Sequence, residues 1–115
     1  MYLLDSNACI EFLRGKNAAF LGRFVSHPPV DVSVCTVVTA ELLYGAAKSK
    51  NPVGERAKVD RFLSLYANFP FDAAAARLFA DRRVELEARG MMIGEFDLMI
   101  AAIALANNLT LVPTT

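Results

Sequence analysis

The sequence predicts an α/β domain built on a central parallel sheet. Short apolar stretches with the character of buried strands alternate with longer segments whose apolar residues repeat at helical spacing. That alternation is typical of strand–helix–strand units, in which helices cover both faces of a parallel sheet. The chain has 115 residues, which is enough for one hydrophobic core, so we expect a single domain over residues 1–115.

The first strand and the helix after it carry the first candidate functional group. Residues 2–4 are apolar and few, so we expect them at the centre of the sheet, where both faces are buried. Asp5 follows directly, then Ser6 and Asn7, which can both cap a helix over residues 8–14. Ligands of open α/β sheets bind beyond the carboxyl ends of the strands, so a carboxylate there is a candidate functional group.

Later segments continue the same alternation. Thr36 and Thr39 can open the third helix, and Asp72 can cap the long fifth one. Gly90 and Asn108 are typical helix terminators. The remaining helices are expected over residues 18–26, 40–48, 55–66, 73–89 and 98–107. The remaining strands are expected over residues 32–35, 68–71 and 110–112, and Pro70 suits an edge strand better than a central one.

The composition points to a protein that buries part of its surface against a partner. Hydrophobic residues make up 55% of the chain, and large apolar patches on small domains usually mark interfaces. The longest apolar run, residues 98–106, is too short for the ~20 residues that span a bilayer. We expect no membrane segment and, without a secretory signal pattern, a cytoplasmic location.

The sequence gives no sign of three common kinds of functional site. Twelve basic residues balance twelve acidic ones, so net charge does not indicate nucleic-acid binding. His27 is the single histidine and precedes two prolines, which argues against a catalytic triad. Cys9 and Cys35 match no zinc spacing and are expected as small core residues.

Three acids share a place in the predicted fold. Asp5, Glu41 and Asp97 each follow, or are inferred to follow, the carboxyl end of a strand. Converging carboxylates without His or Cys suit hard cations such as Mg²⁺ or Mn²⁺, and a metal there suits phosphoryl chemistry. From spacing alone, helix caps and surface charges explain these acids equally well.

Four stretches carry a resemblance to a known family. They are residues 4–7, 38–45, 85–90 and 93–102. In order and spacing they resemble the PIN-domain ribonuclease toxins of VapBC toxin–antitoxin systems. The resemblance implies a three-layer α/β/α PIN fold and the toxin component of a type II system. It also implies Mg²⁺-dependent endoribonuclease activity on structured RNA, inhibition by a cognate VapB-type antitoxin and a homodimer. The subgroup that the chain resembles most acts on initiator tRNA.

The same resemblance assigns roles to individual residues. Asp5 and Asp97 would bind the metal directly, and Glu41 would complete the acidic catalytic site. Ser6 and Asn7 are expected both to cap the first helix and to orient Asp5 or a water molecule on the metal. A basic cluster either grips phosphates near the site or is solvated surface charge; its members are Arg14, Lys16, Lys48 and Lys50.

The end of the sequence departs from the family pattern. Family members usually carry Asn or Asp as a fourth site residue and continue for another strand. Here that position falls on Thr115, or on Thr114 if Pro113 is an insertion, and neither residue carries a charge. The departure predicts a weak or single-metal enzyme. Glu95 is either a partial replacement or an exposed loop residue.

Other classes remain as alternatives. A haloacid-dehalogenase phosphatase would need a second Asp where Asn7 stands, and a receiver domain would need charges that this chain lacks. The main alternative is a catalytically weakened PIN domain that acts as an antitoxin-binding or dimerisation module.

Overall fold

A four-stranded sheet organises the part of the chain that the computed structural model describes, residues 1–14 and 28–112. Its strands are β1 (Tyr2–Leu4), β2 (Val32–Cys35), β3 (Ala67–Phe69) and β4 (Thr110–Val112). Their order is β3-β2-β1-β4, and every neighbouring pair is parallel. The central place of β1 and the edge place of β3 confirm the sequence-based expectations.

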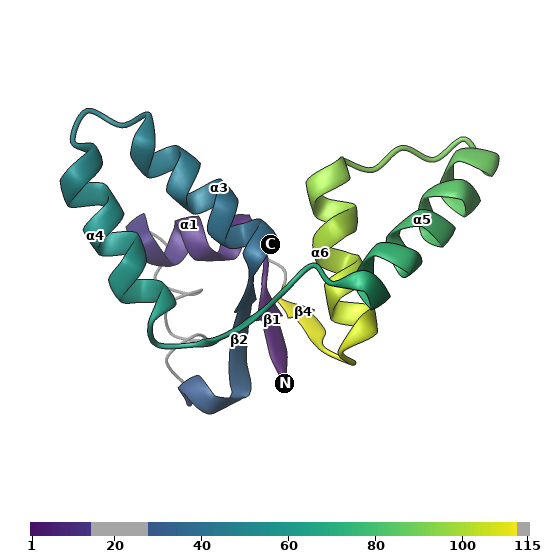
Figure 1. Cartoon of the computed structure of the whole chain (residues 1–115), viewed down its shortest axis with the longest axis horizontal. Coiled ribbons are helices and arrows are strands. Elements are labelled where there is room, and N and C mark those ends of the chain that lie inside the picture. Colours follow the sequence, from purple (N-terminus) through teal and green to yellow (C-terminus); the bar gives the residue numbers. More distant parts are fainter. Residues whose placement is uncertain (15–27, 113–115) are drawn as a thin grey trace.

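The helices lie on both sides of this sheet (Figure 1). On one side are α1 (Ser6–Arg14), α3 (Thr36–Ala47) and α4 (Pro52–Leu63); on the other are α5 (Ala73–Ala88) and α6 (Glu95–Ala106). A short 3₁₀ turn, Pro29–Asp31, leads into β2. The helix expected over residues 18–26 lies outside the described residues. None of the described helices has the length and apolar content that crossing a membrane requires.

The two central strands, β1 and β2, are largely buried, as the centre of a parallel sheet requires. Leu3 and Leu4 of β1 are fully or almost fully buried, and so are all four residues of β2. The sequence of β2 alternates in polarity, but its Ser33 is buried as well. Its hydroxyl donates a hydrogen bond of 2.7 Å to the carbonyl oxygen of Tyr2, which satisfies a polar group that would otherwise destabilise the core.

The predicted cap of α1 is wrong, whereas the predicted start of α3 is right for one of its two candidates. Asp5, not Ser6 or Asn7, caps α1: the Ala8 N–H donates to its Oδ1 at 2.7 Å, and the helix begins at Ser6. Helix α3 begins at Thr36, one of the two threonines expected to open it, and its N-cap residue Cys35 makes no side-chain cap. Thr39 lies inside the helix, where its hydroxyl donates to the Cys35 carbonyl at 3.1 Å.

Two helices begin three residues earlier than predicted. Asn51 caps α4 by accepting a 3.2 Å hydrogen bond from the Gly54 N–H, and Pro52 occupies the first helical position. Proline is favoured there because its missing N–H would be unsatisfied anyway. Helix α6 begins at Glu95, so Asp97 lies in its first turn rather than ahead of it.

Three other boundaries follow the sequence. Asp72 caps α5 by accepting a 3.0 Å hydrogen bond from the Ala75 N–H. Gly90 follows that helix with a φ of 69°, and Asn108 follows α6 with a φ of 55°. Both values lie in the left-handed region, which glycine and asparagine adopt more readily than other residues.

Cys9 and Cys35 are fully buried free thiols of the core, as expected. Burial raises the pKa of the Cys9 thiol far above its ordinary value, and the charge of Asp5 acts in the same direction. Burial also raises the pKa of Cys35, although the N–H groups of Val38 and Val37 oppose the effect. Both thiols therefore stay protonated at neutral pH and are poor nucleophiles and metal ligands.

We predict that neither thiol reacts with an aromatic disulfide reagent in the native state at pH 8. Both should react completely in denaturant, because unfolding restores solvent and an ordinary pKa. The measurement is the release of the chromophore with and without 6 M guanidinium. Rapid stoichiometric labelling of the folded protein would show that these side chains are accessible and that the core differs from the one described.

Candidate acidic site

Asp5 is fixed at the carboxyl end of the central strand by the helix that follows it. Its main-chain carbonyl accepts the Cys9 N–H at 3.1 Å, and its Oδ1 accepts the Ala8 N–H at 2.7 Å. The carboxylate therefore lies at the N-terminus of α1, where the helix dipole favours a negative charge. One of its two oxygens is engaged by the helix, so the orientation of the group is set by the backbone.

Glu41 lies beside this end of the sheet because β1 and β2 pair in parallel. The register places Tyr2 opposite Val32 and Leu3 opposite Ser33, so α1 and α3 both begin at the same edge. The Ser6 hydroxyl donates a hydrogen bond to Oε1 of Glu41. This contact joins the first residue of α1 to the middle of α3 across 35 residues of sequence.

Asp97 comes from the opposite side of the sheet. It is exposed in the first turn of α6, and its Oδ2 would lie 3.5 Å from a Cβ placed on Gly94. The side chain is thus turned back toward the N-terminus of its own helix. Within residues 1–14 and 28–112, no three His, Cys, Asp or Glu side chains form a group that could hold one metal ion.

The other residues that the sequence suggested for the site do not gather around the three acids in the described part of the chain. Asn7 is exposed at the start of α1, and Thr115 lies outside the described residues. Glu95 is exposed and pairs with Arg83 of α5 at 3.3 Å. It belongs to a helix and not to a loop. Of the basic cluster, Lys48 places its ammonium 4.8 Å from the centre of the Tyr44 ring.

The donor chemistry of these acids nevertheless suits a hard cation. Asp5, Glu41 and Asp97 offer only oxygen atoms, and Mg²⁺ is commonly held by one or two carboxylates with several water molecules. A closed cage of three protein carboxylates is therefore not required. The two core thiols, being protonated, do not compete for the ion.

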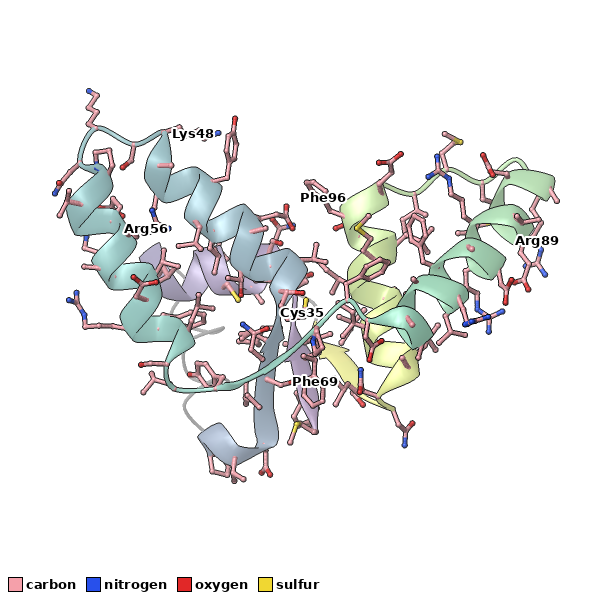
Figure 2. All side chains as sticks on the ribbon, viewed as in Figure 1. Cys35, Lys48, Arg56, Phe69, Arg89 and Phe96 are labelled. Atoms are coloured by element: carbon pink, nitrogen blue, oxygen red, sulfur yellow. The ribbon has the colours of Figure 1, made fainter. Side chains whose placement is uncertain are left out.

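A groove of about 1120 Å³ lies next to Glu41. The exposed face of α3 forms its floor, α1 and α4 line one wall, and α6 lines the other. Figure 2 shows Phe96 reaching from α6 toward α3, and Lys48 at the far end of α3. The lining is mostly apolar and includes Ile10, Leu13, Val37, Ala40, Glu41, Tyr44, Gly45, Lys48, Glu55, Val59, Phe96 and Met99.

Sequence reasoning did not predict this groove. A signal for it exists in α3, which has apolar residues on its solvent side as well as on its buried side. Val38 and Leu42 are buried, whereas Tyr44 is 66% exposed, and Ala40 is also exposed. A helix that is apolar all round usually lies in a core or against a partner.

Comparisons with known proteins place the chain in one family. The family model for the PIN domain matches residues 2–115. The chain is 34% identical to Ribonuclease VapC2 of Rickettsia felis, over 97% of this chain and 84% of that protein. It is 35% identical to the tRNA(fMet)-specific endonuclease VapC of Shigella flexneri, over 96% of this chain and 83% of that protein.

Comparison with solved structures leads to the same group of proteins. The crystal structure of VapBC2 from Rickettsia felis bound to a promoter DNA fragment superposes with a TM-score of 0.90 at 32% identity, covering 99% of this chain and 86% of the other. FitAcB from Neisseria gonorrhoeae superposes with a TM-score of 0.89 at 30% identity, covering 100% and 88%. The three-layer α/β/α fold matches these structures. The chain therefore belongs to the PIN-domain family and, within it, to the VapC-type ribonuclease toxins.

Proposed function

We propose that this chain is the toxin of a type II toxin–antitoxin system and cleaves structured RNA with the help of Mg²⁺ or Mn²⁺. The observation that carries the proposal is the arrangement at the end of β1. There Asp5 is fixed by the α1 cap, and Ser6 bonds Glu41. The name of the Shigella flexneri relative supports initiator tRNA as the substrate. A cytoplasmic location remains part of the proposal.

Each acid has a separate role in the proposed site. Asp5 and Asp97 would hold the ion from the two sides of the sheet, and Glu41 would complete the negative charge around it. The ion, when bound, would activate water and neutralise charge on the phosphodiester. Ser6 holds one oxygen of Glu41 and thereby fixes the direction of its carboxylate. Asn7 would support Asp5 from the start of the same helix.

A second function has two observations in its favour. The Asp97 carboxylate is turned toward Gly94, and the described residues form no group of three metal-binding side chains. That arrangement suits a catalytically weakened PIN domain that binds an antitoxin or dimerises. A cleavage assay on RNA with added metal separates this module from the enzyme.

We predict that Asp5→Asn, Glu41→Gln and Asp97→Asn each reduce metal-dependent RNA cleavage at least about a hundredfold, the scale of losing one group that stabilises a transition state. Stability should change by less than about 1 kcal/mol. Asparagine still caps α1, and glutamine still accepts from Ser6. Ser6→Ala should lower the rate about tenfold by releasing Glu41.

The matched control for these variants is Glu95→Gln. It removes an acid from the same turn as Asp97, but this acid bonds Arg83 in an exposed pair that contributes little. Cleavage should stay near the wild-type rate. EDTA should abolish wild-type activity and Mg²⁺ should restore it. Wild-type cleavage in any of the three acid variants would remove that residue from the site.

We also propose that a VapB-type antitoxin occupies the groove beside Glu41. The lining is largely apolar, as the site of an amphipathic segment should be, and the similar solved structures are VapBC complexes. The carboxylates of Glu41 and Glu55 favour a basic side chain on the partner. Such a side chain set against Glu41 would cover the acidic site and inhibit cleavage.

We predict that Phe96→Ala weakens antitoxin binding about tenfold, because truncating an aromatic anchor of an interface typically costs more than about 1 kcal/mol. The matched control is Leu105→Ala on the same helix. The two side chains are similarly exposed, at 55% and 53%, but Leu105 does not line the groove. Calorimetric titration measures both. Equal affinities for the two variants would place the antitoxin elsewhere.

A homodimer completes the proposal. Large apolar side chains gather in the connection between α5 and α6, where Met91, Met92 and Ile93 are all exposed. Met92 is 89% exposed and stands between two other exposed apolar side chains. A contiguous apolar patch of this kind is typical of an interface, whereas a single exposed apolar side chain is not. A second copy of the chain would remove this surface from water.

We predict that the wild-type protein sediments as a dimer and that Met92→Asp converts it to a monomer, because a charge is expensive to bury in an apolar contact. Val53→Asp is the control: Val53 is 84% exposed on α4, and its substitution should leave the dimer intact. Sedimentation velocity distinguishes the species. A wild-type monomer at micromolar concentration, or a dimer that survives Met92→Asp, would contradict this interface.

A further inference from the structure

Gly45 of α3 has no role that the fold itself explains. It does not share the left-handed conformation of Gly90, and a Cβ placed on it would meet nothing within 4 Å. Glycine is less favourable in a helix than every residue except proline, because it loses the most backbone freedom on folding. Alanine at this position would fit the described structure and strengthen the helix.

Two of the other three described glycines have an intramolecular reason, and the third lies outside a helix. A Cβ on Gly54 would lie 2.3 Å from the side-chain nitrogen of Asn51, which caps α4. Gly90 has a φ of 69°. Gly94 precedes α6, and a Cβ on it would make an ordinary 3.5 Å contact with the Asp97 carboxylate. Of the four glycines in the described part of the chain, Gly45 is the one inside a helix that neither a close contact nor a left-handed φ explains.

What surrounds Gly45 is the groove. The residue is half-buried in the groove floor, one turn beyond Glu41 and beside the exposed Tyr44. A missing side chain at this point opens a passage to the main chain of α3 between bulkier residues. The distance between two packed helices is set by the side chains at their contact, so the absence of one allows a closer approach.

We propose that Gly45 is the crossing point at which the main chain of a groove-bound antitoxin segment passes directly over α3. This inference rests on the proposed function of the groove. It adds that the partner carries a small residue at the crossing point and apolar residues on either side of it. A basic residue of the partner would lie toward Glu41 or Glu55. The size of residue 45 then limits which segments the groove accepts.

The test is a graded series, Gly45→Ala, Gly45→Ser and Gly45→Leu, with Ala47→Leu as the control. Ala47 is exposed on the same helix and does not line the groove. The probe is the antitoxin encoded beside this gene, titrated by calorimetry into purified toxin. Thermal unfolding of each free variant is measured in parallel.

The expected result separates stability from binding. Gly45→Ala should raise Tm by about 2–4 °C, because the helix gains a better former. Affinity for the antitoxin should nevertheless fall with residue size, by more than about tenfold for Gly45→Leu, or about 1.4 kcal/mol. Ala47→Leu should bind within about twofold of wild type.

Two outcomes overturn the inference. One is a Gly45→Ala variant with a lower Tm, which would show that the fold itself needs glycine. The other is an affinity for the antitoxin that stays at the wild-type value throughout the series. If Gly45→Leu does not fold, the affinities of Gly45→Ala and Gly45→Ser decide whether the inference holds. A wild-type protein that binds no antitoxin would instead contradict the proposed partner, so the two failures are distinguishable.

Discussion

The parallel pairing of β1 with β2 is the constraint on which the acidic site depends. In parallel strands the carboxyl ends meet at one edge, so the helices that follow them begin side by side. β1 has only three residues and β2 four, yet both are buried and held in register. Asp5 and Glu41 are brought together by this register and not by any direct attraction between two negative charges. The hydroxyl of Ser6 then bonds the second acid to the helix that carries the first.

Much of the fold could be predicted because local and global signals agree. Each of the four described strands is short, and each lies within two residues of its predicted place. Asp72, Gly90 and Asn108 each have one strong local preference, for a cap or for the left-handed conformation. Nothing in the tertiary structure competes with those preferences, so the boundaries they mark are correct.

The site was predicted less completely because its residues serve two purposes. Asp5 looked like a functional acid followed by two capping residues, whereas the acid itself is the cap. The sequence cannot reveal this, since Asp, Ser and Asn are all suitable caps and the choice depends on where the strand ends. The prediction that Asp97 follows the carboxyl end of a strand is wrong, because the loop after α5 leads into α6 and Asp97 lies in the first turn of that helix. The direction of its side chain depends on a helix that begins three residues earlier than the hydrophobic pattern suggested.

The pairing of β1 with β4 has a consequence for the order in which the protein becomes active. Residues 2–4 are bonded to residues 110–112, and the Thr110 N–H also donates to the carbonyl of Met1. Contacts so distant in sequence form late, because the loop between them must first be closed at an entropic cost. On the ribosome, β1 waits until residues 110–112 have been made before its second neighbour exists. A nascent chain therefore carries Asp5 and Glu41 long before it carries Asp97 and β4, and synthesis itself delays the appearance of a complete site.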